Sequence, residues 1–272
     1  MLRSMSAAIS GMRNHQTAMD VVASNIANVN TSGYKAARVN FKEALYQSYS
    51  KGSSGGTDTG GTNPMQVGLG MNLGGVTSVM TQGTVVSTGK NTDTMIQGEG
   101  FFVLGTMNGG TVTPAYFTRD GSFAVDSQGY LVEPVSGLYV GDVAGSGPIQ
   151  IQGNWSSFSI GADGKITGVL PDGSVDTANQ PQIGLAKFPN PEGLVRGGNS
   201  MYQAGNNSGP ATYNAPNSGG CGQMVAGSLE ASNVDLAEQF SRMIMAQRGF
   251  QANTRIINSS DEMLQELNNL KR

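Results

Sequence analysis

The last part of the chain, residues 232–272, reads SNVDLAEQFSRMIMAQRGFQANTRIINSSDEMLQELNNLKR. It contains one glycine, Gly249, and no proline, and its apolar side chains recur three and four residues apart. This spacing predicts one long helix with an apolar stripe, capped by Ser232 with Asp235 in a weak capping box. A continuous helix would be about 57 Å long, and a rod of that length needs a partner to bury its stripe. The predicted packing residues are Leu236, Phe240, Met243, Phe250, Ile257, Leu264 and Leu267.

A second helix is expected over residues 4–27, ending in the turn-forming residues 28–33. The only formal charges between residues 4 and 28 are Arg13 and Asp20, whereas a solvated helix normally carries charge opposite its apolar stripe. We therefore predict that this helix packs on most of its sides; the alternative is a helix inside an ordinary core. The predicted packing residues are Met5, Ile9, Met12, Met19 and Ile26, with Asn25 and Asn28 at the end of the helix.

The middle of the chain is typical of β structure. All ten prolines lie from Pro64 to Pro216, and short apolar runs are divided by turn pairs such as Asp120-Gly121. Repeated turns between short strands predict hairpins, and the absence of crossover helices predicts a mostly antiparallel sheet. Residues 34–49 are expected to form an extended or partly helical bridge. Residues 50–75 are rich in Gly, Ser and Thr, which predicts a flexible linker or a loop that orders only on a neighbour.

These elements predict an α+β fold. The long N- and C-terminal helices are expected to pair as an antiparallel coiled coil, with a mostly antiparallel β domain inserted between them. The expected organisation is a terminal helical domain of residues 1–30 and 230–272, connecting segments of residues 31–75 and 215–229, and a β-rich outer domain of residues 76–214.

Composition excludes several classes of function. Charged residues make up 13% of the chain, against a usual share of about 25%, and the net charge is −3. Because no basic patch occurs, nucleic acid is not an expected partner. No apolar run approaches the roughly 20 residues of a membrane span, and no signal peptide is recognisable, so membrane insertion is not expected. A charge-poor, glycine-rich surface suits a protein covered by copies of itself, although a turn-rich β protein has the same composition.

The sequence shows no catalytic constellation. His15 is the only histidine, so a catalytic triad has little to draw on, and a packed polar residue is the expected role of this side chain. Cys221 is the only cysteine, which excludes a disulfide within the chain, and the carboxylates are scattered rather than clustered. We therefore predict that the protein is not an enzyme and that it has no cofactor or metal site.

Three motifs resemble those of one family. Residues 20–34, DVVASNIANVNTSGY, are similar to the N-terminal signature of bacterial flagellar rod and hook proteins, which Asn25, Ala27, Asn28 and Gly33 carry here. The resemblance continues in residues 117–123 and 126–131 and closes in residues 230–236 and 245–251. It implies an axial structural protein that leaves the cell through the flagellar type III export apparatus without a cleaved signal and polymerises into a tube. The terminal helices would line the inside of the tube, and the β domain would form its outer layer.

Three parts of the chain resemble the hook proteins of the short type most: the closing motif of residues 246–272, the opening residues 11–12 with 20–22, and the glycine-rich residues 51–75. The expected function is therefore a subunit of the flagellar hook, a flexible tubular joint that transmits torque from motor to filament, with residues 51–75 as an adjustable contact. The implied partners are copies of the chain, the neighbouring rod and hook–filament junction proteins, the hook cap and the export apparatus. The alternatives are a distal rod protein, which is a rigid drive shaft, and an adhesive or ligand-binding module at the cell surface.

Overall fold

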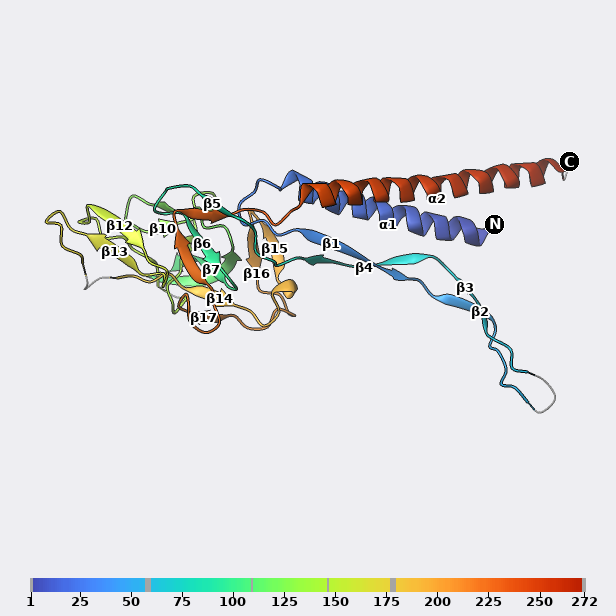
Figure 1. The fold of residues 1–272 in the computed structure, drawn as a ribbon, viewed down its shortest axis with the longest axis horizontal. Coiled ribbons are helices and arrows are strands. Elements are labelled where there is room, and N and C mark those ends of the chain that lie inside the picture. The colour runs from blue at the N-terminus through green and yellow to red at the C-terminus, as the bar shows by residue number, and fades with distance from the viewer. Residues whose placement is uncertain (1, 57–59, 109, 146, 177–179, 271–272) are drawn as a thin grey trace. The chain divides into compact units, whose positions relative to one another are not determined.

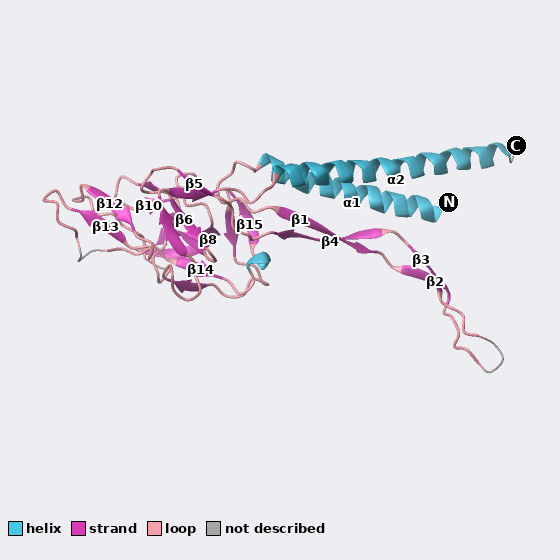
Figure 2. Cartoon of the chain, viewed as in Figure 1, coloured by secondary structure: helices cyan, strands magenta, loops and turns pink. Residues whose placement is uncertain are grey.

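The computed structural model describes residues 2–56, 60–108, 110–145, 147–176 and 180–270. The chain divides into two compact units, each of which is described by itself. The first unit is made of Met1–Ala27, Ala37–Ser78 and Asp235–Arg272, and the second of Asn28–Ala36 and Val79–Val234. The first unit therefore contains both helices, and the second contains most of the strands (Figure 2).

The first unit is built on two long helices, α1 (Leu2–Ala27) and α2 (Leu236–Leu270), which lie side by side (Figure 1). Helix α1 ends where the sequence predicts, because Asn28 begins a turn in which its carbonyl oxygen accepts the N–H of Thr31 at 3.2 Å. Helix α2 begins later than Ser232. The Asp235 carboxylate is its N-cap and accepts the N–H groups of Ala237 and Glu238 at 2.8 and 3.3 Å. An aspartate there also meets the positive end of the helix dipole.

A long β hairpin completes the first unit. Strand β1 (Ala37–Glu43) pairs with β4 (Met71–Ser78), and β2 (Tyr46–Ser50) pairs with β3 (Met65–Gly68), both antiparallel. Strands thus occupy much of residues 34–75, where the sequence predicts a bridge and a flexible linker. The hairpin also contacts α1, since the side-chain amide of Asn14 donates to the carbonyl oxygen of Met71 at 2.7 Å. Pairing along the ladder and packing on the helix offset the ordering entropy that an isolated linker could not overcome.

The second unit is an antiparallel β structure. Its largest sheet, among the described residues, has nine strands in the order β15-β16-β8-β7-β11-β10-β9, with β14 paired to both β7 and β17. The strands of this sheet are β7 (Phe101–Asn108), β8 (Thr111–Thr118), β9 (Ala124–Val125), β10 (Leu131–Val132), β11 (Tyr139–Val140), β14 (Leu185–Lys187), β15 (Val195–Gly198), β16 (Met201–Gln203) and β17 (Thr212–Asn214). Three smaller pairs are β5 (Val85–Ser87) with β19 (Ser228–Glu230), β6 (Thr94–Gln97) with β18 (Gln223–Ala226), and β12 (Ser157–Ile160) with β13 (Ile166–Val169). One short 3₁₀ helix, η1 (Pro191–Gly193), precedes β15.

The core of this unit lies on both faces of the central strand β7. Its residues alternate between two clusters, with Phe102 and Leu104 in one and Phe101 and Val103 in the other. Successive side chains of a strand point to opposite faces, so a strand buried on both sides is apolar at every position. This explains the unbroken run FFVL at residues 101–104. The α+β class and the mostly antiparallel sheet agree with the sequence prediction.

Candidate functional site

The two helices of the first unit run antiparallel. The side-chain amide of Asn25 donates to Oε1 of Gln239 at 3.1 Å, and Gly11 lies against the side chain of Asn253. Going back fourteen residues along α1, from Asn25 to Gly11, matches going forward fourteen residues along α2. The pairing therefore keeps one register over about four turns.

Small residues bring the two helix backbones close together. A Cβ atom added at Gly249 would lie 2.6 Å from the ring atoms Cε1 and Nε2 of His15, and one added at Gly11 would lie 2.9 Å from Nδ2 of Asn253. Contacts this short do not occur for real Cβ atoms, so each glycine leaves room for a side chain of the other helix. The sole histidine thus packs on a glycine of α2.

Several of the most deeply buried positions of the helices differ from the predicted stripes by one residue. On α1 the buried Ala8 and Gly11 are each followed by a predicted packing residue that is only half-buried, Ile9 and Met12, whereas the predicted residue Asn25 is itself buried and Ile26 is half-buried. One residue is about 100° around a helix, so the predicted residues lie on a neighbouring face. On α2 the buried residues are Gln239, Ala246 and Ser260.

The remaining predicted residues are accessible to different degrees. Met5, Met19, Asn28, Met243, Phe250, Ile257 and Leu264 are half-buried, and Leu236, Phe240 and Leu267 are exposed. Their contact with other subunits stays a prediction.

Asn25 links three elements of the first unit. Its Oδ1 accepts the N–H of Ala37 at 2.8 Å, and its Nδ2 donates to the carbonyl oxygen of Ala37 at 2.8 Å as well as to Gln239. The side chain is only 1% exposed, so these bonds satisfy an amide that would otherwise be costly to bury. Asn25 therefore fixes the end of α1 to the start of β1 and to the first turns of α2.

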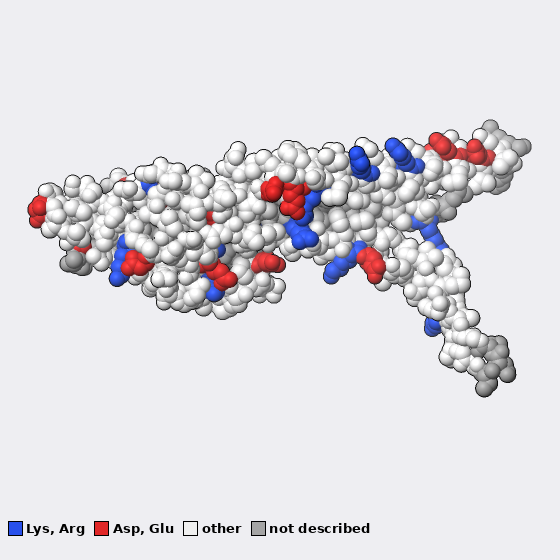
Figure 3. Space-filling model, viewed as in Figure 1, with Lys and Arg blue, Asp and Glu red and all other residues white. Residues whose placement is uncertain are grey.

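The helix pair leaves much apolar surface accessible. On α2, Phe240 and Ile244 are each 51% exposed and Met245 is 63% exposed. Charged side chains are sparse on the face of the molecule seen in Figure 3. A groove of about 200 Å³ runs between α1, β1 and α2, with Val22 and Val39 among its lining residues. Apolar surface of this extent is typical of a protein that binds copies or partners.

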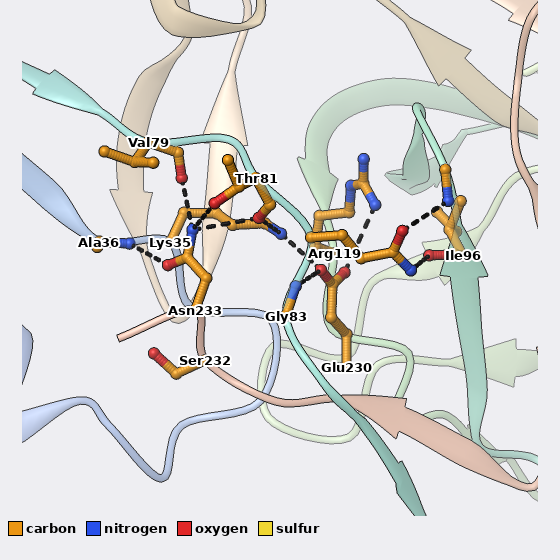
Figure 4. Close-up of polar contacts among 12 residues, drawn as sticks. Lys35, Ala36, Val79, Thr81, Gly83, Ile96, Arg119, Glu230, Ser232 and Asn233 are labelled. Atoms are coloured by element: carbon orange, nitrogen blue, oxygen red, sulfur yellow. Dashed lines mark hydrogen bonds and ion pairs between the residues drawn. The ribbon is translucent and has the colours of Figure 1, made fainter. Parts of the chain in front are cut away.

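The second unit holds a buried charge cluster, formed by Lys35, Arg119 and Glu230 (Figure 4). Lys35 Nζ lies 2.6 Å from Oε1 of Glu230, and Arg119 Nη1 lies 3.5 Å from Oε2. The side chains of the lysine and the glutamate are 1% and 0% exposed. The N–H of Gly83 also donates to Oε1 of Glu230 at 2.8 Å, and Lys35 Nζ donates to the carbonyl oxygen of Thr81. Two cations thus share one carboxylate away from solvent.

Burial dominates the electrostatics of this cluster. It lowers the pKa of Lys35 and the pKa of Arg119, because a charged group loses its hydration there, while Glu230 raises both pKa values in part. The guanidinium of Arg119 also lies over the ring of Phe101, 5.2 Å from its centroid. The cluster contains one more positive charge than negative charges.

Asn233 ties the neighbouring segments together. Its Oδ1 accepts the N–H of Ala36 at 2.7 Å, and its Nδ2 donates to the carbonyl oxygen of Val79 at 2.8 Å and to Oγ1 of Thr81 at 2.9 Å (Figure 4). Residues 36, 79 and 234 are places where the chain passes between the two units. The cluster and Asn233 therefore fasten these segments within the second unit.

Sequence reasoning identified the motifs but missed this cluster. Lys35 directly follows the first motif, Arg119 lies in the second and Glu230 opens the third. Charged residues are rare in this chain, but Asp20, Asp120 and Asp235 also lie in the motifs, so position in a motif does not single out these three residues.

The described residues contain no group of three or more His, Cys, Asp or Glu side chains that could hold a metal ion. Over the same residues, no helix has the length and apolar character needed to span a membrane.

Paired terminal helices, accessible apolar surface and an intervening β unit define a structural protein that assembles with other subunits. Comparison with known proteins gives the family. Three family models match: flagella basal body rod protein over residues 5–35, the D1 domain of flagellar hook protein FlgE/F/G over residues 95–168, and the C-terminal domain of flagellar basal body rod FlgEFG protein over residues 225–270.

Relatives match over their whole length. The chain is 45% identical to the flagellar basal-body rod protein FlgG of Bacillus subtilis and 35% identical to FlgG of Borreliella burgdorferi, with all of each chain covered. It is 28% identical to the flagellar hook protein FlgE of Borreliella burgdorferi, again over both full chains. The chain belongs to the family of flagellar basal-body rod and hook proteins. It is therefore a structural component of the bacterial flagellum, where it forms part of a polymeric assembly.

Proposed function

We propose that the chain is a subunit of the distal rod, the drive shaft of the flagellum. The observation that carries this proposal is the 45% identity to a basal-body rod protein along the entire length of both chains. The alignment with the hook relative spans 449 residues at 28% identity, so that protein is much longer. These comparisons favour the rod alternative over the hook that the sequence motifs suggested.

The proposed mechanism is mechanical. Copies of the chain polymerise so that the apolar faces of α1 and α2 meet the helices of neighbouring copies, and the paired helices form the inner wall as a coiled coil. Phe240, Ile244 and Met245 supply apolar area that the single chain leaves in water. Burying such area contributes about 25 cal/mol for each Å². The second unit forms the outer layer, and the exported subunits add to the neighbouring rod and hook proteins.

The hook is the second candidate, because the closing motif of residues 246–272 resembles hook proteins of the short type. Electron microscopy of purified protein left to polymerise separates the two. A straight tube supports the rod, and a curved tube supports the hook. Failure to form any tube at high concentration, with the chain remaining an ordered monomer, would contradict both.

The proposed contact face is tested by adding charge to α2. Phe240→Glu places a carboxylate at an exposed apolar position, so the second unit should still fold while tubes no longer form. Gln251→Glu is the matched control, since it adds the same charge at an exposed polar position of the same helix and should leave polymerisation unchanged. Tubes of normal yield from the Phe240 variant, measured by sedimentation, would show that this face makes no contact. Ile9→Glu and Phe250→Glu test the half-buried faces in the same way.

Residues 51–75 are proposed as an adjustable contact between copies. They include β3 and the start of β4. Replacing residues 51–64 with Asn-Gly removes the segment beyond the paired strands and supplies the two-residue turn that a β2–β3 hairpin needs. The proposal predicts altered stiffness of the polymer and impaired motility, and unchanged values of both would refute it.

A further inference from the structure

Beside the buried charge cluster lies a small pocket of about 90 Å³. Its walls are partly apolar and include Met80, Phe101 and Phe188. Arg119 lines it from within the unit, and Lys187 and Glu99 line it nearer to solvent, with side chains 34% and 73% exposed. The volume is well above the roughly 10–15 Å³ that one water molecule needs.

Arg119 has hydrogen-bonding capacity that the protein does not use. Its Nε is buried and has no hydrogen-bond partner among the described residues, and its Nη1 makes a long 3.5 Å contact with Glu230. The N–H groups of a guanidinium lie in its plane and donate at its edge, so the contact of its face with Phe101 does not block them. A buried donor without a partner is unfavourable, so the protein leaves this guanidinium only partly satisfied. An anion in the pocket would add hydrogen bonds at the part of the guanidinium edge that remains accessible.

The formal charges of the side chains around the pocket favour an anion with one negative charge. Lys35 and Arg119 share the carboxylate of Glu230, which leaves one positive charge uncompensated. Lys187, the third cation at the pocket, is neutralised by Glu99 at 2.8 Å. An arginine edge binds a carboxylate in a planar, charge-assisted arrangement. The apolar walls and the small volume suit a carboxylate better than a doubly charged phosphate.

We propose that this pocket is a binding site for a carboxylate, held by Arg119 and Lys187. Glu99 competes with the incoming group for Lys187, because its carboxylate already occupies that ammonium group. The carboxylate comes either from a small molecule in solution or from an acidic side chain of a neighbouring copy in the polymer.

The test is a titration of the monomeric full chain with sodium acetate, followed by the nuclear magnetic resonance signal of the Arg119 Nε–H group. Sodium chloride at the same ionic strength is the reference. Acetate should shift the signal in a saturable manner. Lys187→Gln should weaken the affinity at least fivefold, and Glu99→Gln should strengthen it severalfold by freeing Lys187. Both residues are partly exposed and contribute little to stability, so neither variant should unfold the unit.

Three results would overturn the proposal: no saturable shift, an equal shift with chloride, or affinities that neither variant changes. Tighter binding of phosphate than of acetate would replace the carboxylate with another anion. A polymerisation assay then separates the two sources. If a neighbouring copy supplies the carboxylate, acetate competes with it and raises the protein concentration needed for tubes. If the ligand is a free anion, that concentration is unchanged while the monomer titration still saturates.

Discussion

Replacing Glu230 by glutamine tests the buried charge cluster directly. The substitution keeps an oxygen that accepts the N–H of Gly83 but removes the only negative charge of the cluster. Lys35 and Arg119 are then buried together with no counter-ion. Breaking a buried ion pair by removing one partner costs about 3–5 kcal/mol. For a unit of about 150–250 residues, each kcal/mol lowers the unfolding midpoint by about 2–4 °C, so the expected shift is about 6–20 °C.

Trp155 provides the assay. It is the only tryptophan of the chain, it packs against the core of the second unit, and its indole N–H donates to Asp176 at 3.1 Å. Thermal unfolding followed by its fluorescence therefore gives the midpoint of the unit that contains Glu230, and urea unfolding gives the corresponding free energy. The matched control is Glu99→Gln, which removes an exposed partner of Lys187 and should cost at most about 0.5 kcal/mol.

A second variant separates charge from packing. Adding Lys35→Met to Glu230→Gln removes one of the two uncompensated cations, so it should recover part of the lost stability. If Glu230→Gln costs no more than the exposed control, the buried cluster carries no electrostatic energy. If the double variant is no more stable than the single one, the loss comes from altered packing and the reasoning fails.

Three further predictions concern other positions. Gly249→Ala should lower the stability of the helix pair by about 1–3 kcal/mol, because the added Cβ would overlap His15. Alanine normally favours a helix, so an increase in stability would contradict this reasoning. Thermal unfolding followed by far-ultraviolet circular dichroism measures the change. Asn25→Leu should cost about 2–3 kcal/mol in the same assay, because it leaves both backbone groups of Ala37 without their partner. Burial raises the pKa of the Asp120 carboxyl group above its ordinary 3.8, so the folded state binds the carboxyl proton more tightly than the unfolded state does. The free energy of unfolding should therefore fall as the pH rises from about 4 through the folded pKa. Asp120→Asn should remove this decline in urea titrations at a series of pH values, and an unchanged pH profile would exclude Asp120 as its source.

Local signals allowed the element types at both ends and in the middle to be predicted. Helix α1 ends at Ala27 because the residues after it form a turn, and Gly33 has a φ of +66° that favours glycine. A Cβ at Gly33 would also lie 2.5 Å from the backbone nitrogen of Asp120, so this glycine of the first motif is required for packing as well. Such features depend on neighbouring residues and can be seen in a short window of sequence.

Two features that depend on distant residues escaped prediction. The hairpin of the first unit pairs Phe41 with Leu73, and nothing in the glycine- and serine-rich residues between them indicates that register. The buried charge cluster brings together residues 35, 119 and 230, each of which alone looks like an ordinary surface charge. Only the fold shows that these side chains are shielded from water and that they meet.

The helices show why the phase of an apolar stripe is harder to predict than its period. A search for periodic apolar residues selects the largest ones, such as Phe240, whereas the close contact between α1 and α2 uses small residues such as Gly11 and Gly249. Small residues let the backbones approach, and the larger side chains then lie on adjoining faces that the single chain leaves accessible. Each helix therefore has one face against its own partner and another that the single chain leaves accessible, which is the proposed assembly face. It follows that a substitution at Phe240 can block the polymer without separating the pair, while one at Gly249 separates the pair first.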